Sequence, residues 1–291
     1  MLLLFGKNGQ VARELQIAAA DRGITLQVYS SDEADFRYPQ QVLHCLQNRS
    51  PGTCVVNAAA YTHVDQAESE ADVAECVNAV TPGLIAEECQ RRNLHFIHLS
   101  TDYVFSGDQT APYAEDDPTG PVNVYGRTKL LGEQRILKAF PQAIVLRTSW
   151  VFSSHGKNFV TTMLKLAQTR DRLSVVDDQW GGPTSAAAIA RTILRIAQRI
   201  SQSSSDSSPA GLYHYAGAPP TSWHGFAKEI FQQAKLEIAL QPIATAQYPT
   251  PAARPNNSIL DCHRILQDYG IPQPDWKQDL AEVIRQFARP I

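Results

Sequence analysis

No run of 18 apolar residues occurs in the sequence, so no segment has the length and character of a helix that crosses a membrane. The N-terminal segment MLLLFG is apolar for only a few residues before Gly6, which is too short for the core of a secretory signal. We therefore expect a soluble protein that is not exported and has no membrane partner.

An excess of charge of either sign is also missing. The 26 basic and 29 acidic residues give a formal net charge of −3, and the two signs are interspersed along the chain. Proteins that bind nucleic acid or an anionic membrane surface carry clusters of Lys and Arg, which this sequence does not show. We expect a small molecule as the partner, and no nucleic acid.

Cysteine is sparse, with five residues and no CxxC pair. An odd number of cysteines in a chain of 291 residues is typical of reduced thiols, which predicts a cytoplasmic protein. His95 and His98 lie three apart in a segment that reads as a strand, so their side chains point to opposite faces and make poor joint metal ligands. We predict no metal site from these residues.

Short apolar segments alternate with longer amphipathic ones in the N-terminal half. Several of the short segments are apolar enough to be buried on both faces of a sheet. The repeated strand and helix order predicts an α/β fold with a doubly wound, Rossmann-type parallel sheet and right-handed crossovers. The predicted strands are 2–5, 24–29, 54–60, 95–100 and 143–149, and the predicted helices are 9–22, 39–48, 67–92 and 124–139.

The pattern loosens after residue 150. We predict two domains, 1–150 with the Rossmann-type sheet and 151–291 mainly as a smaller, substrate-binding cap, with some segments of the second half returning to the first. The Ser-rich stretch 201–210 predicts a mobile surface loop rather than a linker. In the second half the predicted strands are 173–178 and 211–217, and the predicted helices are 185–200, 223–235 and 277–288.

A glycine loop follows the first predicted strand and opens the first predicted helix. Gly6 permits a tight turn, Gly9 lets the backbone approach a ligand, and the small Ala12 lets helix and strand pack closely. A dinucleotide pyrophosphate binds at such a helix N-terminus, so domain 1–150 is predicted to bind NAD(P). An ordinary strand-to-helix turn is the alternative. The predicted cofactor-binding residues here are Gly6, Lys7, Asn8, Gly9, Gln10 and Val11.

The end of the second strand bears on the choice between NADPH and NADH. NAD-binding units have an acid there that holds the ribose hydroxyls, whereas this chain has Tyr29, Ser30 and Ser31. Hydroxyls together with Lys7 suit a 2′-phosphate, which predicts NADPH. NADH remains the alternative, with Asp32 as the acid and Lys7 as a solvated lysine.

Tyr125 and Lys129 lie four residues apart at the start of a predicted helix, so they share one of its faces. A free phenol has a pKa of about 10 and is a weak proton donor at neutral pH. We expect the Lys129 ammonium to lie beside the phenol and to lower its pKa. The pair Ser100 and Thr101 ends the predicted strand HFIHLS, at the sheet edge where open α/β sheets bind ligands.

Eight motifs spread over most of the chain carry a resemblance to a known family. The chain resembles the dTDP-4-dehydrorhamnose reductases, which belong to the extended branch of the short-chain dehydrogenase/reductase superfamily. The motifs, in chain order, are GKNGQV, ADF, NAAAYT, STDYVFSG, NVYGRTKLLGE, RTSWVF, DQWGGPTS and RPNNSILD.

The resemblance implies roles for three residues in the reduction of a sugar ketone. Tyr125 would donate its proton to the C4 carbonyl oxygen while a hydride moves from the nicotinamide to C4, and Lys129 would also hold the nicotinamide ribose. Thr101 would hydrogen-bond the same oxygen, with Ser100 as the competing hydroxyl. In related dehydratases an Asp-Glu pair follows the threonine, whereas Asp102 is followed here by Tyr103, which favours plain reduction.

The resemblance also implies contacts with the cofactor and the sugar nucleotide. Each of these positions has a structural alternative, such as a core aromatic, a turn acid, a helix-packing alanine or a surface ion pair. Trp180 is a weaker candidate. The expected cofactor contacts are Asp35, Phe36, Ala58, Ala59, Ala60 and Tyr61, and the expected substrate contacts are Thr101, Asp102, Trp150, Asn158 and Arg254.

Some reductases of the family dimerise through Mg²⁺ held by acidic residues, one of which corresponds to Glu14. Another of those positions falls at Ala187, so the resemblance allows a homodimer but leaves Mg²⁺ in doubt. Two other functions stay open: reduction of another 4-keto nucleotide sugar, and a non-catalytic role like that of the methionine adenosyltransferase regulatory subunit.

Overall fold

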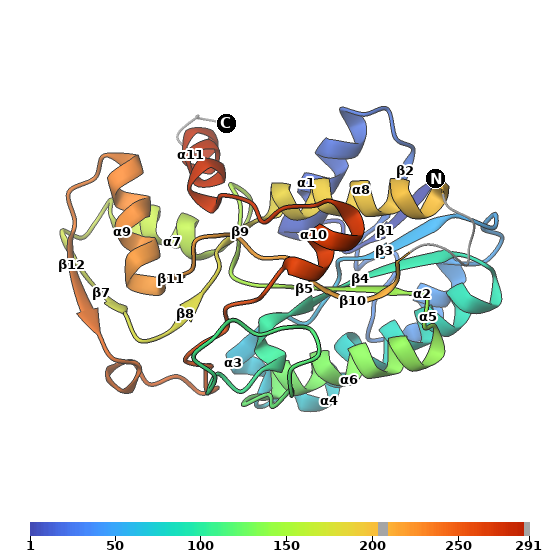
Figure 1. Cartoon of the computed structure of the whole chain (residues 1–291), viewed down its shortest axis with the longest axis horizontal. Coiled ribbons are helices and arrows are strands. Elements are labelled where there is room, and N and C mark those ends of the chain that lie inside the picture. The colour runs from blue at the N-terminus through green and yellow to red at the C-terminus, as the bar shows by residue number, and fades with distance from the viewer. Residues whose placement is uncertain (203–208, 288–291) are drawn as a thin grey trace.

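The structure is a computed structural model that describes residues 1–202 and 209–287. Six parallel strands form its central sheet in the order β10-β5-β4-β3-β1-β2 (Figure 1). This confirms the predicted α/β fold with a Rossmann-type sheet. The strands are β1 (Leu2–Phe5), β2 (Leu26–Tyr29), β3 (Cys54–Asn57), β4 (His95–Thr101), β5 (Ile144–Thr148) and β10 (Gly211–His214).

Helices cover both faces of this sheet, which explains why its strands are apolar on both sides. Alternate residues of β1 show the division, because Leu2 and Leu4 belong to one hydrophobic cluster and Leu3 and Phe5 to the other. Figure 1 shows α1 (Gln10–Ala20) and α8 (Ala186–Gln202) together on one face. The helices α2 (Pro39–Cys45), α5 (Thr81–Arg91) and α6 (Val124–Ala139) cover the other.

The single helix predicted over 67–92 is wrong. The chain forms α3 (Val64–Ala67), α4 (Ala71–Glu75), a π-helical turn η1 (Cys76–Val80) and then α5. Close packing against α6 accompanies the turn, because a Cβ at Gly132 would fall 2.1 Å from the Asn78 carbonyl oxygen. The Asn78 amide also binds the backbone of Tyr61 and the Thr128 hydroxyl. These contacts come from distant segments, so the local sequence pattern does not reveal them.

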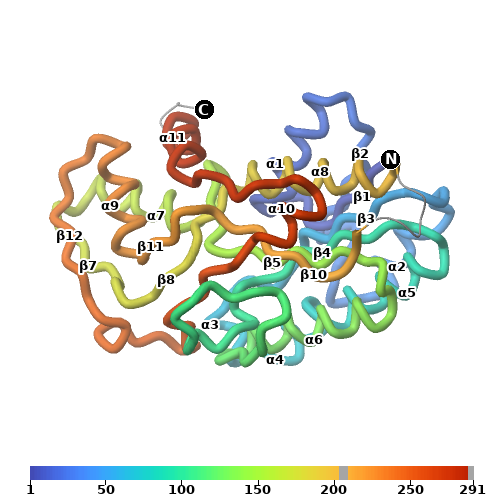
Figure 2. Tube along the Cα trace, in the orientation of Figure 1, coloured from blue at the N-terminus to red at the C-terminus, as the bar shows by residue number. Residues whose placement is uncertain are grey.

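Much of the C-terminal half forms a second body with its own core. Figure 2 shows α7, α9, β7 and β12 together at the end of the molecule away from the central sheet. Phe152, Phe226 and Trp276 are buried at the centre of this core. The elements are β6 (Val151–Phe152), α7 (Phe159–Leu166), β7 (Arg172–Val176), β8 (Trp180–Gly181), β9 (Thr184–Ser185), β11 (Thr221–Ser222), α9 (Trp223–Ala234), β12 (Ala239–Ile243) and α11 (Trp276–Phe287).

Three segments beyond residue 150 join the first body: β10 pairs with β5, α8 packs against α1, and α10 (His263–Tyr269) packs against β10 and α8. Of the loop predicted over 201–210, residues 203–208 lie outside the described residues, and 201–202 end α8. The five cysteines are free. Within residues 1–202 and 209–287, no helix combines the length and the hydropathy needed to cross a membrane.

Candidate active site

The candidate catalytic residues lie where β4 ends and α6 begins. Thr101 is the last residue of β4, and Tyr125 and Lys129 lie on the first turns of α6. Asn123 caps this helix, because its Oδ1 accepts a hydrogen bond from the Gly126 N–H at 2.7 Å. A Cβ at Gly126 would fall 2.2 Å from the Tyr103 carbonyl oxygen, so the glycine allows α6 to start against the segment that follows β4.

Lys129 does not act on Tyr125 in the way the sequence suggested. Its buried Nζ donates to the Leu99 carbonyl oxygen at 2.6 Å and lies 3.2 Å from His98 Nε2. Burial lowers the pKa of Lys129 to about 8, with Glu133 acting in the opposite direction. Burial raises the pKa of Tyr125 to about 12, whereas the expectation was a lowered value. The expectation that Lys129 lies beside Tyr125 and lowers its pKa is therefore wrong, because the Lys129 amine binds the backbone of β4.

Thr101 and Asp102 form a hydrogen-bonded pair at the same edge. Thr101 Oγ1 donates to Asp102 Oδ1 at 3.0 Å and accepts from the Tyr103 N–H at 3.2 Å. Asp102 is 2% exposed, and its Oδ2 has no hydrogen-bond partner among the described residues. Burial raises the pKa of this carboxyl to about 6, and the nearby Ser258 and Thr101 hydroxyls act in the opposite direction. A buried acceptor left in this way suits a hydroxyl donor on a ligand.

Ser100, the alternative to Thr101 as the hydroxyl that meets the ketone, already forms a hydrogen bond within the protein. Its Oγ donates to Glu133, whose carboxylate is also held by Arg147 at 2.9 and 2.7 Å. Arg147 and Glu133 form a buried ion pair that joins β5 to α6. His214 of β10 adds a contact to Arg147 at 3.3 Å. This network supports the floor of the site, and sequence patterns do not predict it because its members are far apart in the chain.

The glycine loop approaches the chain that follows β3. Gly6 has a φ of +95°, and a Cβ on it would fall 2.8 Å from backbone atoms of Ala58 and Ala59. Gly9 is the N-cap of α1; among the described residues no side chain caps this helix and no acid occupies its first turn. The N–H groups in the first turn of α1 can thus bind an anion, and the loop fits a dinucleotide pyrophosphate.

The other predicted cofactor contacts surround this loop. The half-buried Ala58, Ala59, Ala60 and Tyr61 follow β3. Lys7 and Asn8 are exposed, and Val11 is buried against the sheet. Asp35 binds Arg37 through both carboxylate oxygens, while Phe36 is 5% exposed and packs edge-on against Phe5. The carboxylate and the ring therefore already have partners within the protein.

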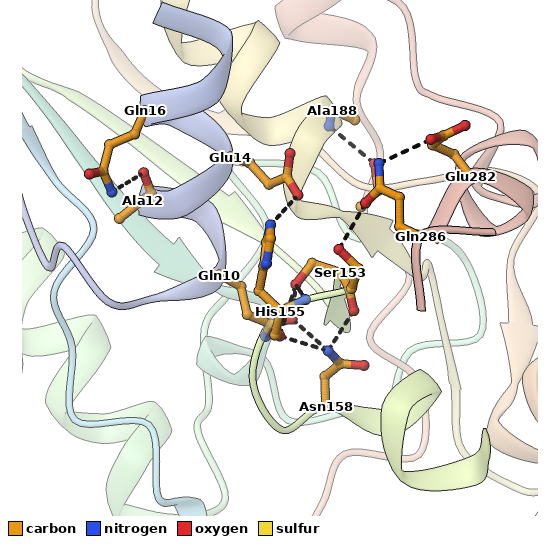
Figure 3. A network of polar contacts seen from close by, with 12 residues as sticks. Gln10, Ala12, Glu14, Gln16, Ser153, His155, Asn158, Ala188, Glu282 and Gln286 are labelled. Carbon is orange, nitrogen blue, oxygen red and sulfur yellow. Dashed lines mark hydrogen bonds and ion pairs between the residues drawn. The ribbon is translucent and has the colours of Figure 1, made fainter. Parts of the chain in front are cut away.

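Asn158 and Gln10 belong to a network that ties α1 to the second body (Figure 3). Asn158 Oδ1 caps α7, and its Nδ2 donates to Gln10 Oε1 and to two backbone carbonyl oxygens, those of Ser153 and His155. All polar groups of Asn158 are thus used within the protein. An Asn before the helical pattern FVTTMLKL is itself an N-cap signal, which the interpretation as a sugar contact overlooked.

Glu14 points into the same region and lies 3.2 Å from His155 Nε2 (Figure 3). Burial raises the pKa of Glu14, and His155 acts in the opposite direction. Ala187 offers no carboxylate to complete a shared metal site. Among the described residues, no group of three or more His, Cys, Asp or Glu is placed to hold a metal ion.

A large cavity opens beside the edge of the sheet where β4 ends and α6 begins. It has a volume of about 1030 Å³, and Tyr103 in its wall contacts the Tyr125 ring edge-on at 5.8 Å. Arg254 also lines it and pairs with Asp65 at 2.7 and 3.0 Å. The sequence interpretation missed several of its lining residues. Two of them are Arg170, which lies just before β7, and Arg172, the first residue of β7.

Trp150 lies between β5 and β6 and has an uncommon backbone conformation. Its φ is +45°, which costs energy for a residue with a bulky side chain. The ring stacks on Trp223 with a centroid distance of 3.5 Å, and a Cβ at Gly181 would touch it at 2.5 Å. Trp223 and Phe159, rather than Trp150, line the cavity, and Trp180 is 46% exposed.

Comparisons with known proteins agree with this architecture. The RmlD substrate binding domain family matches residues 1–289. A dTDP-4-dehydrorhamnose reductase from Burkholderia thailandensis is 40% identical over 295 residues, covering 98% of each chain. The crystal structure of such a reductase from Clostridium acetobutylicum matches with a TM-score of 0.92 at 32% identity and 99% coverage of each chain.

A second solved structure is that of the Bacillus anthracis dTDP-4-dehydrorhamnose reductase in complex with NADP. It matches with a TM-score of 0.90 at 32% identity, covering 98% of each chain. The matches run over almost the whole length, so they include both the central sheet and the second body. This chain therefore belongs to the RmlD family, together with the dTDP-4-dehydrorhamnose reductases.

Proposed function

We propose that the protein reduces the C4 keto group of dTDP-4-dehydro-L-rhamnose with NADPH to give dTDP-L-rhamnose. The observation that carries the proposal is the contact between Tyr103 and Tyr125. It joins the arginine-lined cavity to the edge of the sheet that holds Thr101 and Lys129. A nucleotide sugar in the cavity would thus reach the proton donor, while the glycine loop holds the cofactor on the same edge.

The chain's own residues would handle the proton and the orientation of the ketone. Tyr125 would donate its proton to the C4 oxygen, and Thr101 would turn its hydroxyl from Asp102 to the same oxygen. The unpaired Asp102 Oδ2 would accept a sugar hydroxyl. NADPH, when bound, supplies the hydride.

The cofactor loop supports NAD(P)H binding, and we propose NADPH as the preferred form. Lys7 is exposed beside the end of β2, where it can meet a 2′-phosphate. The structure adds one acid that sequence reasoning overlooked: Glu33 accepts hydrogen bonds from Ser30 N–H and Oγ, both at 2.9 Å. This carboxylate lies where NAD-binding units hold ribose hydroxyls, so we propose that NADH also binds, less tightly.

The nucleotide end of the substrate would lie in the cavity. Arg170, Arg172 and Arg254 supply the positive charge that a diphosphate requires. Trp223 and Phe159 offer aromatic surface to the base or the sugar. The proposal for Arg254 requires its guanidinium to meet the diphosphate while it stays paired with Asp65.

Substrate profiling tests the proposal. Purified protein with NADPH and dTDP-4-dehydro-L-rhamnose should oxidise the cofactor and give dTDP-L-rhamnose. Faster turnover of a different 4-keto nucleotide sugar would replace the substrate and keep the chemistry. Binding of NADPH without turnover of any such sugar would contradict the proposal and favour a regulatory role, which co-purification of a synthetase would then support.

A further inference from the structure

A buried series of contacts joins Asn57, His98 and Lys129 beneath the edge of the sheet that holds Thr101. Their side chains belong to residues that are 0%, 0% and 1% exposed. Asn57 Nδ2 lies 3.0 Å from His98 Nδ1, and His98 Nε2 lies 3.2 Å from Lys129 Nζ. These contacts cross from β3 through β4 to α6, and they end at Lys129, one helical turn from Tyr125, the proton donor in the proposed function on which this inference rests.

The backbone sets the orientation of the Asn57 amide. The Ala59 N–H donates to Asn57 Oδ1 at 2.9 Å. Because a backbone N–H can only donate, the amide oxygen must face Ala59, and the NH₂ group must face His98. Asn57 therefore donates to His98 Nδ1, which must carry no proton of its own.

This contact selects one tautomer of His98. Burial holds the pKa of His98 well below its usual range, and the charge of Lys129 acts in the same direction, so the ring is neutral. A neutral imidazole with a bare Nδ1 carries its proton on Nε2. That N–H group points at Lys129 Nζ, and the lysine must therefore accept a hydrogen bond.

Only the neutral form of Lys129 can do so. An ammonium has no lone pair, whereas a neutral amine can accept from His98 Nε2–H and still donate to the Leu99 carbonyl oxygen at 2.6 Å. Glu133, on the next turn of α6, favours the ammonium, but its carboxylate is already held by Arg147 of β5 and by Ser100. His98 thus opposes Glu133 in setting the protonation of the lysine.

We propose that His98 is a positioning residue for the reduction: held in one tautomer by Asn57, it stabilises the neutral Lys129 that forms each time the lysine restores the proton of Tyr125. The Tyr125 O–H bond breaks as its proton joins the substrate oxygen. Because Nζ is held at the Leu99 carbonyl oxygen, the proton passes from an Nζ–H bond of Lys129 to the phenolate through a bridging water, and solvent then returns a proton to the amine. His98 itself gains and loses no proton.

The tautomer of His98 is the first test, and it needs neither substrate nor a variant. Nitrogen-15 NMR of the intact protein distinguishes a protonated ring nitrogen from a bare one. The expected result is a proton on Nε2 and a bare Nδ1. A proton on Nδ1 would overturn the proposal, because Nε2 would then accept from the Lys129 ammonium. This experiment does not depend on the proposed function, so the two can fail separately.

The second test measures the pKa of Lys129 by carbon-13 NMR of its Cε, assigned from Lys129→Met. His98→Gln keeps a donor and an acceptor, whereas His98→Met has a similar volume and no donor. We expect the pKa to be higher in His98→Met than in His98→Gln by about one unit, a tenfold change in proton affinity. His95→Met on the same strand is the matched control and should leave the pKa unchanged.

The kinetic consequence separates positioning from a merely structural role. Because Lys129 must be protonated to restore Tyr125, kcat should fall as pH rises through the lysine's pKa, and this alkaline limb should move upward in His98→Met together with the NMR value. Equal Lys129 pKa values in His98→Met and His98→Gln would overturn the proposal. If the pKa of Lys129 shifts in His98→Met while the alkaline limb of the kcat profile does not move, the catalytic part of the proposal is wrong.

Discussion

Thr101 Oγ1 donates a hydrogen bond to Asp102 Oδ1 at 3.0 Å, so the two residues at the end of β4 act as one unit. The hydroxyl that would face the substrate ketone is turned towards a carboxylate that is 2% exposed. Its second oxygen, Oδ2, has no partner among the described residues. The site therefore retains a buried carboxyl group at a cost in folding stability.

Asp102→Asn should remove that cost. Burial raises the pKa of Asp102 to about 6, above the value of about 3.9 in an unfolded chain. A raised carboxyl pKa contributes stability that is fully present below about pH 4 and is lost as pH rises through 6, amounting to roughly 3 kcal/mol by pH 7.

Urea unfolding of the wild type and Asp102→Asn between pH 4 and pH 7 measures this. The stability of the variant relative to the wild type should increase over that range, while its kcat falls because the sugar hydroxyl loses its charged acceptor. A stability difference that does not change with pH would contradict the buried, partly protonated carboxyl.

Gly6→Ala should disrupt the cofactor loop more than a positive φ alone explains. Its Cβ would fall 2.8 Å from the backbone of Ala58 and Ala59, and we expect a loss of about 3 kcal/mol in stability together with loss of NADPH binding. Gly23→Ala is the matched control, because Gly23 has a φ of +63° and its Cβ would meet no described atom within 4 Å.

Gly23→Ala should cost only about 1 kcal/mol and leave NADPH binding unchanged. Thermal unfolding and fluorescence titration with NADPH distinguish the two variants. Equal effects of both substitutions would mean that the approach of Gly6 to the Ala58 peptide does not matter.

Lys7→Ala should weaken NADPH binding about tenfold and leave NADH binding unchanged, because only the former carries the 2′-phosphate. Titration of both cofactors on the wild type and the variant measures the difference. An unchanged affinity for NADPH would refute the role of Lys7.

Arg254→Gln should raise the KM for the nucleotide sugar by about tenfold or more, since a bidentate guanidinium contact to the diphosphate is lost, and should leave NADPH affinity unchanged. Arg285→Gln, at the exposed ion pair with Glu282, is the control and should change neither value. If Arg254 served only to hold Asp65, then Asp65→Asn would raise the KM equally.

The outline of the fold was predictable because it follows from local patterns. The burial of β1 on both faces appears in the sequence as a continuous apolar run, and the helix α6 over Val124–Ala139 appears as hydrophobic periodicity. The π-helical turn before α5 was not predictable, since it depends on the approach of Gly132 to Asn78 across two helices.

The site was predictable only in part for the same reason. Motif order predicted Thr101, Tyr125 and Lys129 as catalytic residues, but spacing on a helix does not reveal that Lys129 turns towards His98 and the Leu99 carbonyl oxygen. Arg170 and Arg172 were missed because a cavity wall assembled from β7 and distant loops leaves no continuous pattern. The positions of these side chains depend on contacts between distant segments rather than on their neighbours in sequence.

The most direct test follows NADPH absorbance with dTDP-4-dehydro-L-rhamnose for the wild type, Tyr125→Phe and the exposed control Tyr38→Phe. We predict that Tyr125→Phe binds NADPH normally but loses about 10²- to 10⁴-fold in kcat, because the proton donor is gone, while Tyr38→Phe is unaffected. Turnover by Tyr125→Phe at the wild-type rate, or no turnover by the wild type, would contradict the account.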